Sequence, residues 1–232
     1  MLKLWKFLNN LYEKLLLLVS VLLLVIGVWQ IADNYYLYEN ANDRSILKYK
    51  PGNALSDTSD APPISDDMVG WLTLDGTAID YPVMQAADNT YYLRTDPFGS
   101  YAATGSIFLD SRCSSDFSDP YSMIYGHHMD YGTLFGALDD YLNASYLNTH
   151  RNGTLSVGKD GKKQYDLEVF ASMIVSAHEE TVYNLDSGRI RQFIAEHAPV
   201  YNGAKEGRIL GLSTCLNTGS LSRIVVFCYL KE

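Results

Sequence analysis

The clearest hydrophobic pattern in the chain is one uncharged run near its N-terminus, residues 15–32. As a helix, these eighteen residues would extend about 27 Å, close to the thickness of a bilayer core. The run is apolar on every side, whereas a helix that packs on the core of a soluble protein needs only one apolar face. Its end, Gln30-Ile31-Ala32, is a poor match to a signal-peptidase site. The pattern therefore predicts an uncleaved transmembrane signal anchor.

Positive charge is unevenly distributed around this run. Lys3, Lys6 and Lys14 precede it, and residues 33–42 contain neither Lys nor Arg. Positive charge is retained on the cytoplasmic side of membranes. We therefore expect residues 1–14 to form a cytoplasmic tail and the rest of the chain to lie outside the cell, attached to the cell membrane by a single pass.

The pattern changes twice between the apolar run and the next regular region. Residues 33 to about 50 are compatible with a polar helix, which Pro51-Gly52 would end. Residues 53–67 are rich in Ser, Asp, Ala and Pro and have no periodicity, which is typical of a linker. We expect residues 33–67 to be a helical extension and linker, and residues 68–232 to be the folded domain.

Short β-like segments dominate the region from Met68 onward. Residues 71–74 and 79–82 flank Asp75-Gly76, which predicts a hairpin. The further strand-like segments are residues 106–109, 122–125, 154–157, 165–175, 208–212 and 223–230. The two expected helices are residues 133–142 and residues 187–197, the second with Ser187 as its N-cap. Many short strands with few helices predict a mainly β fold, a closed or nearly closed β-barrel with peripheral helices.

Composition narrows the classes of function. Eighteen Lys and Arg against twenty-seven Asp and Glu give a net charge of −9, the wrong sign for a protein whose main partner is nucleic acid. Three cysteines without a C-x-x-C pair do not suit a disulfide framework or a zinc site. His127, His128 and Asp130 are a weak metal-ligand set, because the two histidines are adjacent. We expect no metal and no cofactor.

The three cysteines have different sequence environments. Cys228 alternates with Arg223 across a predicted strand, so we expect it to be a small buried hydrophobe. Cys113 lies in a polar loop and is expected to be an incidental surface residue. Cys215 ends a buried strand before a loop, where scaffolds present reactive groups. Arg223 begins the next strand and could return to the same end, where its charge would favour a thiolate or a developing oxyanion.

A cysteine nucleophile also needs a proton donor for its leaving group, usually a histidine. His150, His178 and His197 occupy polar or helix-end positions, which favours solvated surface side chains. His127 and His128 directly follow a predicted strand and Gly126. One of this pair is the expected acid, and spacing alone does not choose between them.

The combination of Tyr125-Gly-His127, Leu212-Ser-Thr-Cys215 and Arg223 leading a terminal strand resembles the sortases, cysteine transpeptidases of Gram-positive bacterial surfaces. Further segments resemble class B sortases: Gly70-Trp-Leu, Ile79-Asp-Tyr-Pro-Val83, Asp88-Asn89, Tyr92-Leu93, Gly105-Ser-Ile-Phe-Leu-Asp110 and Gly132-Thr-Leu-Phe-Gly136. The resemblance covers roughly residues 68–232. It implies an eight-stranded β-barrel carrying N-terminal helices.

The resemblance also implies the roles of individual residues. Cys215 would be the nucleophile, His127 the general acid and base, and Arg223 the group that stabilises the substrate and the oxyanion. His127 is chosen over its neighbour because the family's histidine directly follows Tyr-Gly. The positions that would bind or support substrate are Asn89, Leu93, Ser213 and Thr214.

The implied reaction cleaves a C-terminal sorting signal after Thr and joins the Thr carbonyl to an amine. With lipid II as the amine, surface proteins become anchored to peptidoglycan; with a lysine of the next pilin, the enzyme polymerises pilins. A cysteine peptidase is a less favoured alternative, because papain-like enzymes place Cys before His, whereas His127 precedes Cys215 by 88 positions. A membrane-tethered binding module with an inactive site is the other alternative.

Overall fold

The computed structural model describes residues 1–41, 44–52, 62–129, 132–203, 205–215 and 221–232, without the side chains of residues 34, 36–41, 187 and 215. The chain forms two compact units, residues 1–42 and residues 43–232. Each unit is described by itself.

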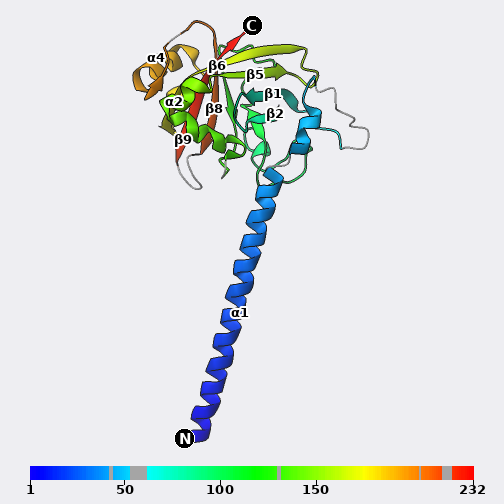
Figure 1. Cartoon of the computed structure of the whole chain (residues 1–232), viewed down its shortest axis with the longest axis vertical. Helices are drawn as coiled ribbons and strands as arrows, with labels where there is room; N and C mark the ends of the chain where they lie inside the picture. The colour runs from blue at the N-terminus through cyan, green and yellow to red at the C-terminus, as the bar shows by residue number, and fades with distance from the viewer. Residues whose placement is uncertain (42–43, 53–61, 130–131, 204, 216–220) are drawn as a thin grey trace. The chain divides into compact units, whose positions relative to one another are not determined.

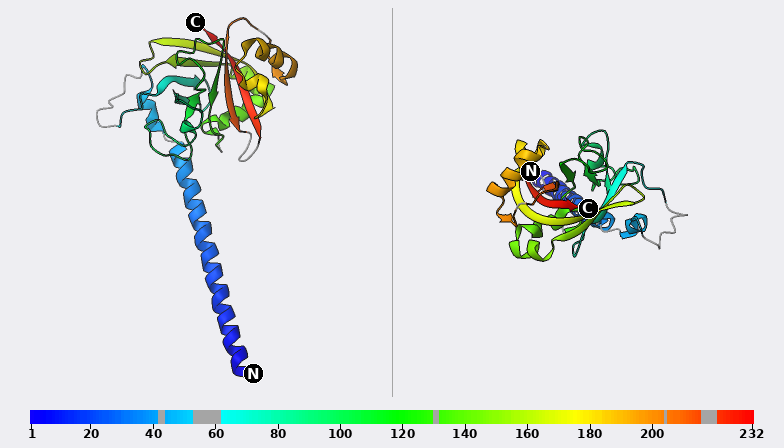
Figure 2. Two further views of the ribbon diagram at one scale, coloured as in Figure 1. Left: turned by 180° about the vertical axis from the view of Figure 1, so that it is seen from behind. Right: turned by 90° about the horizontal axis from the view of Figure 1, so that it is seen from above.

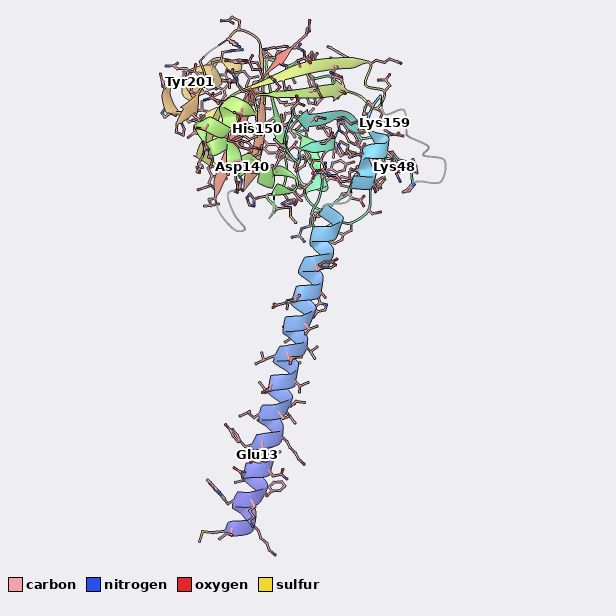
Figure 3. All side chains as sticks on the ribbon, viewed as in Figure 1. Glu13, Lys48, Asp140, His150, Lys159 and Tyr201 are labelled. Carbon is pink, nitrogen blue, oxygen red and sulfur yellow. The ribbon has the colours of Figure 1, made fainter. Side chains whose placement is uncertain are left out.

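The first unit is a single helix, α1 (Leu2–Ala41). Its described side chains point outward all round, and almost all of them are exposed (Figure 3). Within the described residues, this is the one helix long and apolar enough to cross a membrane, over Leu2–Asp33. The predicted span at residues 15–32 lies inside it. A single N-terminal helix of this kind is consistent with a single-pass membrane anchor.

The second unit begins with a short 3-10 helix, η1 (Arg44–Tyr49), where the sequence predicted a continuing polar helix. Ile46 of η1 is buried in a cluster with Trp71 and Phe108. Lys50 Nζ lies 2.8 Å from a carboxylate oxygen of Asp80. These contacts explain why the compact unit begins at residue 43 rather than at the start of the first strand. Most of the predicted linker, residues 53–61, lies outside the described residues.

The centre of the second unit is a closed eight-stranded β-barrel, as expected (Figures 1 and 2). The described part of the sheet has nine strands, and all of them except β7 form the barrel. The strands are β1 (Met68–Leu74), β2 (Asp80–Met84), β3 (Ile107–Leu109), β4 (Tyr121–Tyr125), β5 (Asn152–Val157), β6 (Lys163–Ser176), β7 (Val200–Tyr201), β8 (Arg208–Cys215) and β9 (Ser222–Lys231). Their order is β5-β1-β2-β3-β4-β8-β9-β6-β7, and a β5–β6 pairing closes the barrel. The short β7 pairs with the far end of β6. The predicted hairpin is present as the antiparallel pair β1–β2.

Alternation along the strands separates two apolar layers. Leu212 and Val226 belong to the large cluster that fills the barrel. Ile209 and Phe227 belong to a second cluster outside it, which Ile190 and Ile194 of α4 cover. Figure 1 shows α4 (Ser187–His197) on this side, next to β9. Successive residues of a strand point to opposite faces. The alternation between the two clusters therefore also determines whether a residue at the end of a strand points into the barrel or away from it.

The helices differ from expectation in detail. The predicted helix at 133–142 is a 3-10 helix, η4 (Phe135–Leu142), which includes Asp140 labelled in Figure 3. The N-cap of α4 is Asp186, not Ser187, because the Asp186 side chain accepts a hydrogen bond from the amide of Gly188 at 3.0 Å. Two short helices were not predicted: α2 (Ala144–Thr149) and α3 (Glu180–Tyr183).

Candidate active site

The candidate catalytic residues lie at the same end of three neighbouring strands. Strands β4 and β8 are parallel, and Tyr125 pairs with Ser213. The amide of Gly126 continues this pairing by donating to the Ser213 carbonyl at 3.2 Å. His127 lies two residues beyond Tyr125, and Cys215 lies two residues beyond Ser213. The two residues are therefore at the same end of the paired strands.

Strand β9 completes the arrangement. It is antiparallel to β8, and Cys215 pairs directly with Arg223. Directly opposed residues of an antiparallel pair share a face of the sheet, so positions 215 and 223 belong to the face of Ser213 and Val225. Arg223 is half-buried, and its Nη1 donates to the Ser222 carbonyl at 3.2 Å. The side chain of Cys215 lies outside the described part of the structure.

The ring of His127 is held by the backbone of another segment. Its Nε2 lies 2.8 Å from the carbonyl oxygen of Leu93, the last residue of η2 (Tyr91–Leu93). A carbonyl only accepts hydrogen bonds, so Nε2 carries the proton in this arrangement. Nδ1 is then the ring nitrogen that can accept a hydrogen bond. The His127 carbonyl also accepts from the amide of Phe135 at 3.2 Å, which ties the residue to η4.

A glycine before His127 is required by close packing. A Cβ atom on Gly126 would lie 2.8 Å from Cδ2 of the buried Phe135. His128 turns to a different partner, because its Nε2 lies 2.9 Å from a carboxylate oxygen of Asp139 in η4. The structure thus gives the two adjacent histidines distinct environments, which spacing alone could not do.

The predicted substrate positions divide into two pairs. Leu93 is exposed and contacts His127 through its backbone carbonyl, and the Ser213 hydroxyl lies 3.1 Å from the hydroxyl of Tyr183. Asn89 accepts a hydrogen bond from the amide of Ser111 at 2.7 Å, so its amide oxygen holds a loop. Thr214 is buried, and alternation along β8 puts it on the face that fills the barrel. The structure therefore brings Leu93 and Ser213 to the strand ends and gives Asn89 and Thr214 supporting positions.

Sequence reasoning missed several residues that contact this end of the barrel. Asp110 and Arg112 form a salt bridge with a distance of 2.8 Å, and Arg112 also reaches the carbonyl of Tyr183 at 2.9 Å. Asp110 ends a segment that resembles class B sortases, which is a signal for its importance. Tyr183 lies in the four-residue helix α3, which is too short to produce an apolar period.

The other two cysteines are both buried. Cys228 is completely buried inside the barrel, as predicted. The expectation that Cys113 is a surface residue was wrong, because the turn that its amide makes with the Asp110 carbonyl directs Cys113 inward. Burial raises the pKa of the Cys113 thiol to about 11, and it also raises the pKa of Cys228. Neither residue is a thiolate at neutral pH.

Comparison with known proteins identifies the family of the chain. The sequence model of the Sortase domain family matches residues 72–231. Sortase B of Listeria monocytogenes serovar 1/2a is 36% identical over 170 residues, which cover 66% of this chain and 67% of that protein. Sortase B of Staphylococcus aureus is 34% identical over 174 residues, which cover 70% of each protein.

The fold is also similar to solved structures. Spy0129, a Streptococcus pyogenes class B sortase involved in pilus biogenesis, superposes with a TM-score of 0.66 at 29% identity. The superposition covers 72% of this chain and 94% of that structure. The family match, the sequence relatives and the barrel lead to one conclusion. The chain belongs to the sortase family as a class B enzyme, a cysteine transpeptidase that joins surface proteins carrying a sorting signal to an amine acceptor.

Proposed function

We propose that this sortase cleaves the sorting signal after Thr and transfers the Thr carbonyl to an amine of a peptidoglycan precursor, with Cys215 as the nucleophile. The observation that carries the proposal is the strand register. Cys215 pairs with Arg223, and Tyr125 pairs with Ser213, which brings His127, Cys215 and Arg223 to one end of adjacent strands. Nucleophile, proton donor and a fixed positive charge are the groups that acyl transfer requires.

The first half-reaction forms an acyl-enzyme. The Cys215 thiolate attacks the Thr carbonyl carbon, and the resulting oxyanion is stabilised by Arg223. The C–N bond to the next residue breaks as His127 gives a proton to the leaving amine. The product is a thioester between Cys215 and the Thr carbonyl. The hydrogen bond from His127 Nε2 to the Leu93 carbonyl supports this role, because it fixes the ring and leaves Nδ1 for proton transfer.

The second half-reaction restores the enzyme. The acceptor amine attacks the thioester carbon and gives a proton to His127, a new C–N bond forms, and the C–S bond breaks to release the Cys215 thiolate. An amine product forms only if water is kept from the thioester for long enough. Arg223 suits both steps, because its charge does not titrate and its planar fork can bind a carbonyl oxygen in a defined geometry.

Pilin polymerisation is a second candidate function. It differs only in the acceptor, a lysine of the next pilin in place of the peptidoglycan amine. The observation that favours it is the TM-score of 0.66 with Spy0129, which is involved in pilus biogenesis.

We further propose that residues 15–32 span the cell membrane, with residues 1–14 in the cytoplasm and the catalytic domain outside. The apolar α1 supports the span, and the lysines that precede residue 15 support the orientation. This topology places the enzyme where exported surface proteins and cell-wall precursors meet. The catalytic domain is assigned to residues 68–232, with residues 33–67 as an extension and linker.

A direct test incubates the detergent-solubilised full chain with peptides of the N-P-x-T-x and L-P-x-T-x types. A glycine-type amine or a lysine side-chain amine is added, and the products are followed by mass spectrometry. We expect cleavage after Thr with an amine adduct, lost in Cys215→Ala and kept in the matched control Cys113→Ala. Cleavage that survives in Cys215→Ala would contradict the proposal. If an adduct forms with the lysine side-chain amine and not with the glycine-type amine, the result would favour pilin polymerisation.

A further inference from the structure

A ring of contacts, made of hydrogen bonds and closed by the pairing of β4 with β8, lies beside the strand ends. Its centre is the buried carboxylate of Asp110. One carboxylate oxygen accepts from the backbone amide and Nε of Arg112, both at 2.9 Å. The other accepts from Nη2 of Arg112 at 2.8 Å and from the hydroxyl of Tyr125 at 2.9 Å. Asp110 is completely buried, so its charge depends on these donors.

Arg112 extends the ring to helix α3. Its Nη2 also donates to the carbonyl of Tyr183 at 2.9 Å, and the Tyr183 hydroxyl lies 3.1 Å from the hydroxyl of Ser213. Ser213 is the register partner of Tyr125, which returns the ring to Asp110. Four segments, the turn after β3, strand β4, strand β8 and helix α3, are thus joined two residues before His127 and Cys215.

The electrostatics of the ring make Arg112 its least replaceable member. Burial alone would raise the pKa of the Asp110 carboxyl, but hydrogen bonds from Arg112 and Tyr125 hold that pKa below its usual value. The carboxylate is therefore charged at neutral pH. The planar guanidinium of Arg112 reaches both carboxylate oxygens and a carbonyl at once, which a lysine ammonium cannot do.

The packing of the core does not depend on the Arg112 side chain. This side chain is 53% exposed, so its replacement leaves no cavity in the core. Helix α3 stays attached by a second contact, because the buried Tyr121 hydroxyl donates to the Val182 carbonyl at 2.9 Å and Val182 is itself buried. Loss of Arg112 would lower stability, because the buried Asp110 carboxylate loses its main partner, but it would leave the apolar packing of the barrel unchanged.

We infer that Arg112 is a positioning residue for transpeptidation. Through Tyr183 it fixes the Ser213 hydroxyl, and with it the end of β8 that carries Cys215. This inference rests on the proposed function, because it takes Cys215 as the nucleophile. A catalytic group displaced by about 1 Å can lose about 100-fold in rate. Replacing Arg112 should lower kcat and leave KM nearly unchanged, because Arg112 acts through the end of β8 and not through contact with the peptide.

The test compares Arg112→Gln, Arg112→Lys and Tyr183→Phe in the detergent-solubilised full chain. Arg189→Gln is the matched control, because it removes the same charge from a 75% exposed side chain on α4. We expect Arg112→Gln to lower kcat at least tenfold with KM changed less than threefold. Arg112→Lys should recover only part of the rate. The double variant Arg112→Gln/Tyr183→Phe should be no slower than the slower single variant, because both changes break one chain of contacts.

Hydrogen exchange of the amides of residues 213–215 provides a readout that does not require turnover. We expect at least tenfold faster exchange there in Arg112→Gln and no change in Arg189→Gln. A kcat for Arg112→Gln within twofold of the control, additive losses in the double variant, or unchanged exchange would each overturn the inference. If the wild-type chain cleaves no peptide, the proposed function fails, and the exchange rates still decide whether the ring holds the strand end. If Arg112→Gln fails to fold, Tyr183→Phe, which removes one hydroxyl, decides in its place.

Discussion

Replacing Gly126 by Ala tests whether close packing behind His127 determines the position of that residue. The new Cβ would lie 2.8 Å and 2.9 Å from two ring atoms of Phe135, and 3.3 Å from Cγ1 of Ile107. Phe135 is completely buried, so its ring cannot move into solvent. Overpacking of this kind costs about 1–3 kcal/mol, and the stiffer unfolded chain of Ala offsets about 0.4–1 kcal/mol. We expect the free energy of unfolding to fall by about 1–2 kcal/mol.

The same substitution should slow the reaction. The Phe135 amide donates to the His127 carbonyl at 3.2 Å, so a displaced Phe135 moves the histidine as well. We expect kcat/KM for peptide cleavage to fall at least tenfold. Urea unfolding followed by near-ultraviolet circular dichroism measures the stability, and mass spectrometry of the cleaved peptide measures the rate.

Two controls separate crowding from any other effect of the added methyl group. Gly188→Ala adds the same group in the first turn of α4, where the single close neighbour is a carboxylate oxygen at 3.3 Å, and should not lower stability. In a Phe135→Leu background, where a smaller side chain has room to shift, Gly126→Ala should cost at least about 1 kcal/mol less. If Gly126→Ala were as stable and as active as the wild type, the packing argument would be refuted.

Four further predictions follow from the structure. Burial alone would raise the pKa of Glu168, but ion pairs with Lys205 and Lys231 lower it to about 2. Glu168→Gln should therefore reduce the free energy of unfolding by about 1–3 kcal/mol at pH 7. Because the pKa of Glu168 is lower in the folded chain than in the unfolded chain, this stabilisation is present above about pH 4.5 and is lost as the pH falls toward 2. The stabilities of the wild type and Glu168→Gln, measured by unfolding at a series of pH values, should therefore become equal near pH 2. A thiol reagent at pH 7 should label the folded chain once, at Cys215, since Cys113 and Cys228 are buried; mass mapping that finds either of these two labelled would contradict this. Arg223→Lys should lose at least about tenfold in kcat/KM despite its charge, and undiminished turnover would remove Arg223 from the site. A chain lacking residues 1–42 should leave the membrane fraction and keep the near-ultraviolet spectrum of the barrel, because those residues form a separate unit.

The barrel strands could be predicted because their signal is local. Alternation and turn residues mark each strand, and Asp75-Gly76 marks the β1–β2 turn. Strand order is not a local property. It depends on pairing between distant segments, which puts β8 between β4 and β9 and closes the barrel with β5 and β6. The family resemblance implied a closed eight-stranded barrel, but the order of its strands was not predicted.

The elements that were missed are short or depend on tertiary contacts. Helices α2 and α3 have six and four residues, which is too few for an apolar period. Residue Cys113 lies in a polar segment, and only the turn that begins at Asp110 directs it into the core. Packing of Ile46 against Trp71 extends the compact unit beyond the first strand, and no local pattern records that contact.

The candidate site shows the same division. Cys215 and Arg223 could be singled out from their positions at strand ends, and β8–β9 pairing gives them the same register. Spacing could not choose between His127 and His128, whose partners come from η2 and η4. The ring through Arg112 joins residues near 110 and 125 to Tyr183 and Ser213, which lie far along the chain, so no single motif in the sequence contains it.

The most direct test of the account is the mass of the intact enzyme during turnover. The detergent-solubilised chain is mixed with a sorting-signal peptide without amine, quenched in acid and analysed by mass spectrometry. The account predicts an acyl adduct on Cys215 whose added mass equals that of the peptide through its Thr minus one water. The adduct should be removed by hydroxylamine and absent in Cys215→Ala. An adduct on another residue, or peptide cleavage that proceeds in Cys215→Ala, would contradict the assignment of Cys215 as the nucleophile.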